Sequence, residues 1–479
     1  MDFSLVGPAY TQPSVDANAQ ECINWYPIID QVTPRTNLFL YPRPGLTVAA
    51  DLGTNKPIQM LATDNTDIYA VSNATLFKLT PSGDYTTFSV STIGSTSLSA
   101  TETIYYAFNS GNQLCFADSQ YGYVYNTSTG VLAQLDTTLF SGAANMTYMD
   151  GYIFYVIPNS NQVASSPIDN ATDFNPLDVT TFNAKSDLVL AVYGNRRDLW
   201  VVGNNSAEIW YNAGNDNFPF SRRDSVQVDR GTASGDTVIG IDNTLAWLDS
   251  LGQVIIIDGY SPKVISTEPM HAAIRKYASI SDATACSYQE NGQWFAEFTF
   301  PSGEATWVYS MQTNLWHKRA YWDSANAQFI RNKLKYTVLI NNNVFGSGYD
   351  NSIVYFVDDE NYTDNSNPII RTRTSSHSNV QFTKLRMHSL ELKTEGGIGL
   401  NTGQGSTPQI CLQVSKDGGH TWGNEKWRNL GEMGNFKKRV KWNRLGSART
   451  FTFKLTISDP IKCVLLDASA EVTGVNNTR

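Results

Sequence analysis

The chain has 479 residues, of which 41% are hydrophobic, 12% aromatic and only 16% charged. At about 150 residues per domain, this length predicts two or three domains, and polar, uncharged, aromatic-rich chains favour strands and turns. The net charge of −9 argues against a general nucleic-acid-coating role, because such proteins present a large surplus of positive charge to phosphate.

The cysteines and the lengths of the apolar segments argue against further classes of protein. The five cysteines are scattered and form no CxxC pair, which favours buried thiols over a disulfide framework or a zinc site; they are Cys22, Cys115, Cys286, Cys411 and Cys463. The N-terminal sequence MDFSLVGPAY has no basic segment followed by an apolar run, and no stretch approaches the roughly 18 apolar residues needed to span a bilayer. We expect a soluble protein without a membrane anchor.

The first 50 residues predict an extended N-terminal arm that packs on other elements. They contain the stretches YTQPSVDANAQECINWYP and YPRPGL, which are rich in proline and aromatic residues.

Residues 51–357 repeat one unit: a short aromatic or β-branched strand, a turn of Asn, Asp or Gly, and a second such strand. Examples are DLWVVGNNSAEIWYN and TLAWLDSLGQVIIID. A period of about 40 to 50 residues with several strands is typical of propeller blades, which bury their faces against their neighbours. We therefore predict an all-β chain with a β-propeller of about seven blades, and the middle of the second strand falls at Phe77, Val124, Val163, Ile209, Ile255, Trp307 and Val354.

Stacked sandwiches of hairpins are the alternative to a propeller, because strand pairs recur there too. Helical periodicity is almost absent, and MHAAIRKYA at Met270–Ala278 is the best short helix.

A polar stretch, VDDENYTDNSNP, predicts a linker over residues 358–368. A calcium loop is less consistent with it, because the acidic spacing is wrong and no glycine makes the sharp turn. Residues 369–479 then carry longer alternating strands, at Leu385–Leu392, Ile410–Val414, Lys437–Trp442 and Phe451–Ile457. In the last, Phe451, Phe453, Leu455 and Ile457 share one face, as in a strand that lines a core. A C-terminal β-sandwich is the natural interpretation.

SKDGGHTW in this region matches the Asp-box pattern of sialidase-like propellers, S-x-D-x-G-x-T-W. It occurs once and outside the propeller repeats. An Asp-Gly pair also favours a tight turn, with the carboxylate free to accept backbone N–H bonds and the tryptophan covering the turn. We interpret it as a structural turn rather than a catalytic remnant; its pattern residues are Ser415, Asp417, Gly419, Thr421 and Trp422.

Motifs for other chemistry are missing from the sequence. A P-loop, a G-x-S-x-G elbow, a dinucleotide-binding fingerprint and paired histidines at ligand spacing do not occur. A glycosidase needs two positioned carboxylates, and sequence cannot exclude such a pair. No cofactor, metal or catalytic residue is assigned.

The window Gln413–Lys454 holds ten Lys or Arg against three Asp or Glu. In NFKKRVKWNRLG, a strand would place Lys437, Arg439 and Lys441 on one face and Val440 and Trp442 on the other. One interpretation is an ordinary solvated face. The other, with Arg444 added, is a rim that contacts an acidic protein or phosphate.

Several segments in order resemble the packaged-DNA stabilisation or tail hub proteins of short-tailed bacteriophages. They are INWYP, RPGL, RRDLWVVG followed by AEIWYNAG, SVQVDRG, LWHKR and the closing RVKWNRLGSARTFTFKLTISDPIKCVLLDASAEV. The resemblance runs through nearly the whole chain and implies a structural virion protein, not an enzyme.

The resemblance also implies the setting. Such proteins are made in the host cytoplasm and form a ring, expected to be a hexamer, in the virion tail beneath the portal and its adaptor. The ring closes the vertex on the genomic DNA and attaches a needle, spikes or fibres. The competing hypothesis is a propeller glycosidase or carbohydrate-binding protein.

Overall fold

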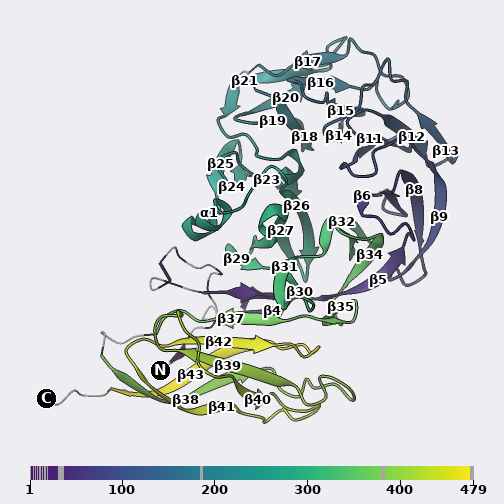
Figure 1. Ribbon diagram of the computed structural model, residues 1–479. Coiled ribbons are helices and arrows are strands. Elements are labelled where there is room, and N and C mark those ends of the chain that lie inside the picture. Colours follow the sequence, from purple (N-terminus) through teal and green to yellow (C-terminus); the bar gives the residue numbers. More distant parts are fainter. Residues whose placement is uncertain are drawn as a thin grey trace.

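The computed structural model describes residues 2–3, 5, 7, 9, 12, 14–15, 18, 20–30, 37–183, 187–378 and 383–474. Figure 1 shows a ring of small sheets with a layered β-domain at one end. The predicted all-β fold, a propeller followed by a sandwich, is therefore confirmed. Part of the expected arm, residues 1–50, lies outside the described residues.

The described residues form seven four-stranded blades. Blade 1 contains β6 (Ile58–Thr63), β7 (Ile68–Ser72), β8 (Thr75–Pro81) and β9 (Phe88–Ser95). Blade 2 contains β10 (Tyr105–Phe108), β11 (Gln113–Ala117), β12 (Gly122–Asn126) and β13 (Val131–Gln134). Blade 3 contains β14 (Met146–Met149), β15 (Tyr152–Val156), β16 (Gln162–Ser165) and β17 (Val179–Thr181).

Blades 4 to 6 continue in the same way. Blade 4 contains β18 (Val189–Asn195), β19 (Asp198–Gly203), β20 (Ala207–Asn212) and β21 (Phe220–Val228). Blade 5 contains β22 (Ile239–Ile241), β23 (Thr244–Leu248), β24 (Val254–Asp258) and β25 (Ser261–Val264). Blade 6 contains β26 (Thr284–Glu290), β27 (Gln293–Phe300), β28 (Ala305–Ser310) and β29 (Leu315–Lys318). The hairpin of β30 (Ala320–Asp323) and β31 (Gln328–Arg331) follows.

Blade 7 is closed by a strand from the other end of the chain. It contains β32 (Leu334–Ile340), β33 (Asn343–Gly348) and β34 (Ile353–Asp358), and its fourth strand is β5 (Gly45–Asp51), antiparallel to β34. The residues just before blade 1 thus complete the last blade, so the ring has no open sheet edge between first and last blades.

The predicted repeat positions are confirmed by the strand order. All seven fall on the third strand of a blade, and all are buried; they are Phe77, Val124, Val163, Ile209, Ile255, Trp307 and Val354. The weakest repeat, around Val163, is a complete blade.

Blade packing follows from the two-residue period of a strand. In β19, Leu199 and Val201 belong to the core between blades 3 and 4, whereas Trp200 and Val202 belong to the core between blades 4 and 5. Both faces of this strand are therefore apolar, as expected for a sheet between two neighbours.

Asn-Gly and Asp-Gly pairs make two of the tight hairpins. Asp150 and Gly151 have φ of 51° and 90°, and Asn291 and Gly292 have φ of 49° and 74°. Two consecutive positive φ values define the turn type that matches the twist of a hairpin, and this explains the residue pairs.

Two sheets make up the sandwich. The first contains β3 (Trp25–Asp30), β4 (Asn37–Pro42), β43 (Leu465–Gly474), β38 (Leu385–Thr394) and β41 (Val440–Ala448), with β1 (Asp2–Phe3) on β43. The second contains β2 (Cys22–Ile23), β37 (Arg371–Thr374), β42 (Thr452–Ile457), β39 (Gln409–Ser415) and β40 (Lys426–Asn429).

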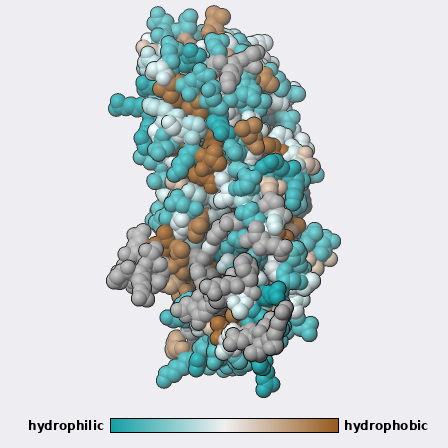
Figure 2. Space-filling view, turned by 90° about the vertical axis from the view of Figure 1, so that its left-hand side faces the viewer, coloured by the Kyte–Doolittle hydropathy of each residue, from teal (hydrophilic) through white to brown (hydrophobic). Residues whose placement is uncertain are grey.

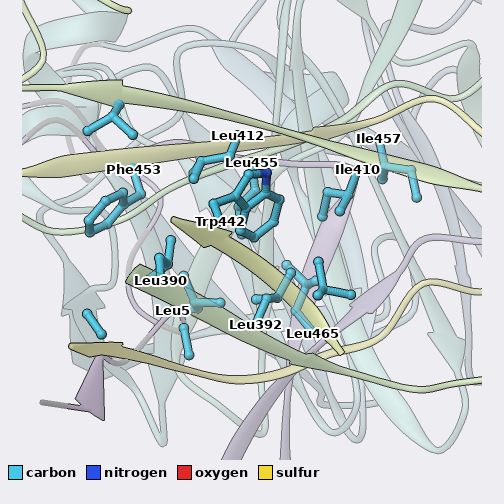
Figure 3. Close-up of a cluster of buried hydrophobic side chains, with 14 of the residues drawn as sticks. Leu5, Leu390, Leu392, Ile410, Leu412, Trp442, Phe453, Leu455, Ile457 and Leu465 are labelled. Atoms are coloured by element: carbon cyan, nitrogen blue, oxygen red, sulfur yellow. The ribbon is translucent and has the colours of Figure 1, made fainter. Parts of the chain in front are cut away.

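The sandwich core lies between these sheets, with the indole of Trp442 at its centre (Figure 3). Phe451, Phe453, Leu455 and Ile457 all enter it, as predicted from their alternation. The predicted buried face of this strand is confirmed.

The propeller and the sandwich are one continuous structure at blade 6. Strand β2 pairs in parallel with β29 at Ile23 and Lys318, and antiparallel with β37, so blade 6 and one sandwich sheet share nine strands. On β3, Trp25 enters the sandwich core and Tyr26 enters the core of blades 6 and 7. Adjacent side chains of one strand thus join the two domains.

A buried ion pair fixes this junction. Arg43 donates to both carboxylate oxygens of Asp364 at 2.9 and 2.5 Å, and through Nε to Asn24 at 2.8 Å. Asn24 in turn donates to the carbonyls of Ala320 and Ile370. Asp364 belongs to β35 (Thr363–Asp364), which pairs with β36 (Asn367–Pro368), so this part of the expected linker contains a small hairpin against β5.

The remaining expectations concern smaller features. A helix, α1 (Glu268–Ile274), occupies the predicted site and ends four residues earlier than predicted. All five cysteines are free and buried, which confirms their expected packing role. Among the described residues, no helix is long and apolar enough to cross a membrane.

The Arg43–Asp364 pair gives the first prediction. Replacing Asp364 by Ala leaves a guanidinium buried without its counter-charge, so we expect the free energy of unfolding to fall by about 3 to 5 kcal/mol. Denaturant unfolding measures it. As a control, Asp224→Ala removes a carboxylate that is 85% exposed beside Arg222 and should change stability by less than about 0.5 kcal/mol. Equal effects of the two substitutions would contradict the role of the buried pair.

Candidate functional site

The first half of the basic segment predicted as a strand is a loop. Strand β41 begins at Val440, so Lys437 and Arg439 precede it and the predicted alternation on one strand face is wrong for them. Val440 and Trp442, which were predicted on the face opposite the basic residues, are buried in the sandwich. The pairing of β41 with β38 begins at Val440, opposite Leu392, and residues 432–439 form an exposed loop before it.

The four candidate basic residues have different environments. Arg439 is 72% exposed but donates to both oxygens of Glu391, at 2.7 and 2.6 Å, and this pairing lowers the pKa of Glu391. Lys441 is half-buried and lies opposite Glu391 in the β38 register. Arg444 is exposed with a φ of 60° where β41 is irregular, and Lys437 is exposed at the loop tip. The structure therefore does not present the four as one continuous basic face.

Two exposed apolar side chains in the same loop were missed from the sequence. Phe436 is 76% exposed and Met433 is 54% exposed. Phe436 is held in place by a neighbouring loop, since a Cβ on Gly397 would lie 2.7 Å from its ring. The sequence marked Phe436 only by its position directly before two lysines, which does not distinguish an exposed aromatic residue from a buried one.

A groove of about 550 Å³ lies beside this loop. Its walls come from β38, β43 and residues 436–439, and Lys393, Lys437 and Lys438 line it together with Phe436. Its acidic lining residues are Glu391, which is already paired with Arg439, and Asp467. A cationic groove with an aromatic edge suits a partner that is acidic and partly apolar.

The Asp-box residues form a hydrogen-bonded turn after β39. Ser415 donates to Asp417 at 2.7 Å, and the backbone N–H groups of Gly419 and Thr421 donate to Ser415 and Asp417 at 2.8 and 2.9 Å. The Thr421 hydroxyl also donates to Asp417. The bonds from Thr421 and Ser415 hold the pKa of Asp417 well below its usual range.

Trp422 is half-buried, and the Lys454 ammonium lies 5.7 Å from its ring centroid. That the indole shields the turn stays a prediction. The carboxylate of Asp417 is engaged by its own loop, which is the arrangement of a structural turn.

A second cavity of about 730 Å³ lies among blades 4, 5 and 6. Its carboxylate Asp198 accepts hydrogen bonds from Arg223 and Tyr260 at 2.9 and 2.8 Å. Among the described residues, no group of three or more His, Cys, Asp or Glu side chains is placed to hold a metal ion.

Comparison with protein families gives two matches that together span nearly the whole chain. Residues 2–360 match the bacteriophage P22 Gp10 β-propeller, and residues 371–473 match the bacteriophage P22 Gp10 β-sandwich. With the fold, these matches define the class: a structural protein of a bacteriophage, associated with the virion and assembled with other virion proteins. The chain belongs to the bacteriophage P22 Gp10 family.

Solved structures add only distant likenesses. A computationally designed protein is 12% identical, with 65% of this chain and 100% of that one covered and a TM-score of 0.39. The extracellular domain of a putative hybrid two-component system from B. thetaiotaomicron is 13% identical, with 77% and 45% covered and a TM-score of 0.45. Both TM-scores are below 0.5. The comparison with curated proteins found no match.

The Asp-box turn gives the second prediction. Asp417→Ala removes the acceptor of several exposed hydrogen bonds, so we expect the free energy of unfolding to fall by about 1 kcal/mol. The pKa of Asp417 is lower in the folded than in the unfolded chain, so its contribution is present above about pH 4 and is lost as the pH falls further. Thermal unfolding of both proteins at several pH values measures the difference, and a gap that widens on acidification would contradict it.

Proposed function

We propose that this protein is a tail hub subunit of a short-tailed phage. In this role, copies form a ring, expected to be a hexamer, that closes the portal vertex beneath the adaptor and retains the packaged DNA. The ring also attaches a needle, spikes or fibres. The observation that supports this most is the match of both domains, in order, to one family of phage proteins.

The architecture is consistent with a rigid subunit of a ring. A closed propeller offers rigid faces and leaves only short sheet edges, and the nine-stranded sheet makes the sandwich continuous with blade 6. We infer that residues 51–357 serve as the propeller body, 358–368 as the connection and 369–479 as the partner-binding sandwich, with residues 1–50 tying them together.

Many modest contacts in one ring can retain DNA together. Each subunit that is linked to its neighbours raises the effective concentration of the next contact. Closing such a ring requires heterologous contacts, in which one surface of a subunit meets a different surface of the next.

Electron microscopy of the purified protein, with and without the portal adaptor and distal tail proteins, tests the hub. We expect rings of the protein alone or rings that form on the adaptor, and no hydrolysis of chromogenic glycosides. A monomer indifferent to these partners would contradict the hub, and glycoside cleavage by a monomer would favour the glycosidase.

The basic residues of the sandwich are proposed as a contact with a tail partner. Replacing Lys437, Arg439 and Lys441 by Ala, with Arg444 as a fourth position, should reduce incorporation into tails, because rim charges guide and orient association. Arg439 is expected to contribute least, since Glu391 already neutralises it. If the variants were incorporated into tails as well as the unchanged protein, the proposed contact would be wrong.

A further inference from the structure

The charges of this chain are strongly segregated along the molecule. Residues 369–479 contain 17 Lys or Arg and 8 Asp or Glu, a net charge of +9. Between Lys78 and Lys185 there are eight Asp or Glu and no Lys or Arg. The sandwich is therefore basic, whereas blades 2 and 3, which lie in that interval, are acidic.

The basic end carries an exposed apolar tip. The loop between β40 and β41 presents Phe436 and Met433 to solvent, directly followed by the exposed Lys437 and Lys438. The loop is ordered by backbone bonds, from Gly434 to the Gly397 carbonyl and from Asn435 to the Glu432 carbonyl. It is a defined surface of the kind that anchors an interface: a large apolar side chain with cations around it.

The acidic end carries the complementary surface. The loop of residues 166–178, between β16 and β17, exposes Leu177 by 75% and Ile168 by 61%. Asp169 and Asp173 are exposed in the same loop. Buried Phe174 and Ala171 fix this loop to the core of blades 2 and 3.

These two loops lie at opposite ends of the molecule. Figure 1 shows β16 and β17 at the top of the propeller and β40 and β41 at the bottom of the sandwich. The space-filling view in Figure 2 shows apolar groups distributed along the length of one face, amid a mostly hydrophilic surface. One chain therefore cannot bring its own two loops together.

We propose that the sandwich-end surface of one copy, Met433, Phe436, Lys437 and Lys438, binds the propeller-end surface of a second copy, Ile168, Asp169, Asp173 and Leu177. Opposite charges at the rims orient the two surfaces, and the aliphatic and aromatic side chains pack at the centre. The contact is heterologous, so its repetition closes into a ring when the rotation between copies permits.

This assignment rests on the proposed ring and names the two surfaces that form it. It also explains why the groove beside Phe436 is lined by lysines, since an acidic loop is its counterpart. Because exposed charges take part, the association weakens as salt is added.

Complementary mixing tests the proposal with the full-length chain. One variant alters the sandwich end (Phe436→Ser, Lys437→Ser and Lys438→Ser), and the other alters the propeller end (Asp173→Ser and Leu177→Ser). All five positions are exposed, so the fold should persist, and circular dichroism checks this. Sedimentation velocity over a concentration series, at low and high salt, measures association.

We expect the unchanged protein to self-associate and each variant alone to need at least tenfold more protein to do so. An equimolar mixture of the two should form one-to-one dimers and nothing larger, because only one intact pair of surfaces remains. The matched control, Leu251→Ser with Lys276→Ser, removes an exposed apolar and an exposed basic residue from other parts of the propeller and should associate like the unchanged protein.

Variants that associate as well as the unchanged protein, or an unchanged protein that is monomeric throughout, would overturn the surface assignment. If rings still formed on the adaptor with either of these results, the proposal of a tail hub would stand and only the assigned surfaces would be wrong. Absence of rings in every combination with tail proteins would instead count against the hub. If the sandwich-end variant lost only the binding of a different acidic virion protein, the second copy would be the wrong occupant.

Discussion

The antiparallel pairing of β5 with β34 is the constraint on which the structure depends. It closes the propeller with residues 45–51, and this requires the preceding chain to pass through the junction with the sandwich. There Arg43 is locked to Asp364 and Asn24, Trp25 enters one core and Tyr26 the other. Closure of the propeller, connection of the two domains and burial of the N-terminal strands therefore depend on one interaction network. Weakening this network would affect both domains.

The junction also determines how force can pass through the molecule. A flexible linker would let the sandwich move independently, but blade 6 and one sandwich sheet are hydrogen-bonded through β2. The sandwich consequently holds its basic loop at a fixed distance from the acidic loop of blade 3. A subunit with two rigidly related ends is suited to a ring, because the angle between successive contacts is set by the fold rather than by a hinge.

The candidate site was only partly accessible from sequence. The charge bias of the window was evident, and Val440 and Trp442 were correctly placed on the strand face opposite Lys441. The loop was not predicted, because Lys437 and Arg439 continue the alternation by chance up to the true start of β41. The pairing of Arg439 with Glu391 joins residues 48 positions apart, which no local pattern reveals. Phe436 was overlooked because an exposed aromatic residue in a loop has the same sequence signature as a buried one.

By itself, the sequence determined the all-β class, the seven repeats and the change to a second domain, because strand periodicity and turn residues are local properties that recur with each blade. It also carried enough family resemblance to identify a phage structural protein. Only the tertiary structure decided which strand closes the propeller and which distant carboxylate pairs with Arg43. It also decided that the acidic and basic loops lie at opposite ends of the molecule. Those features depend on contacts between distant segments, which form only when the whole chain packs.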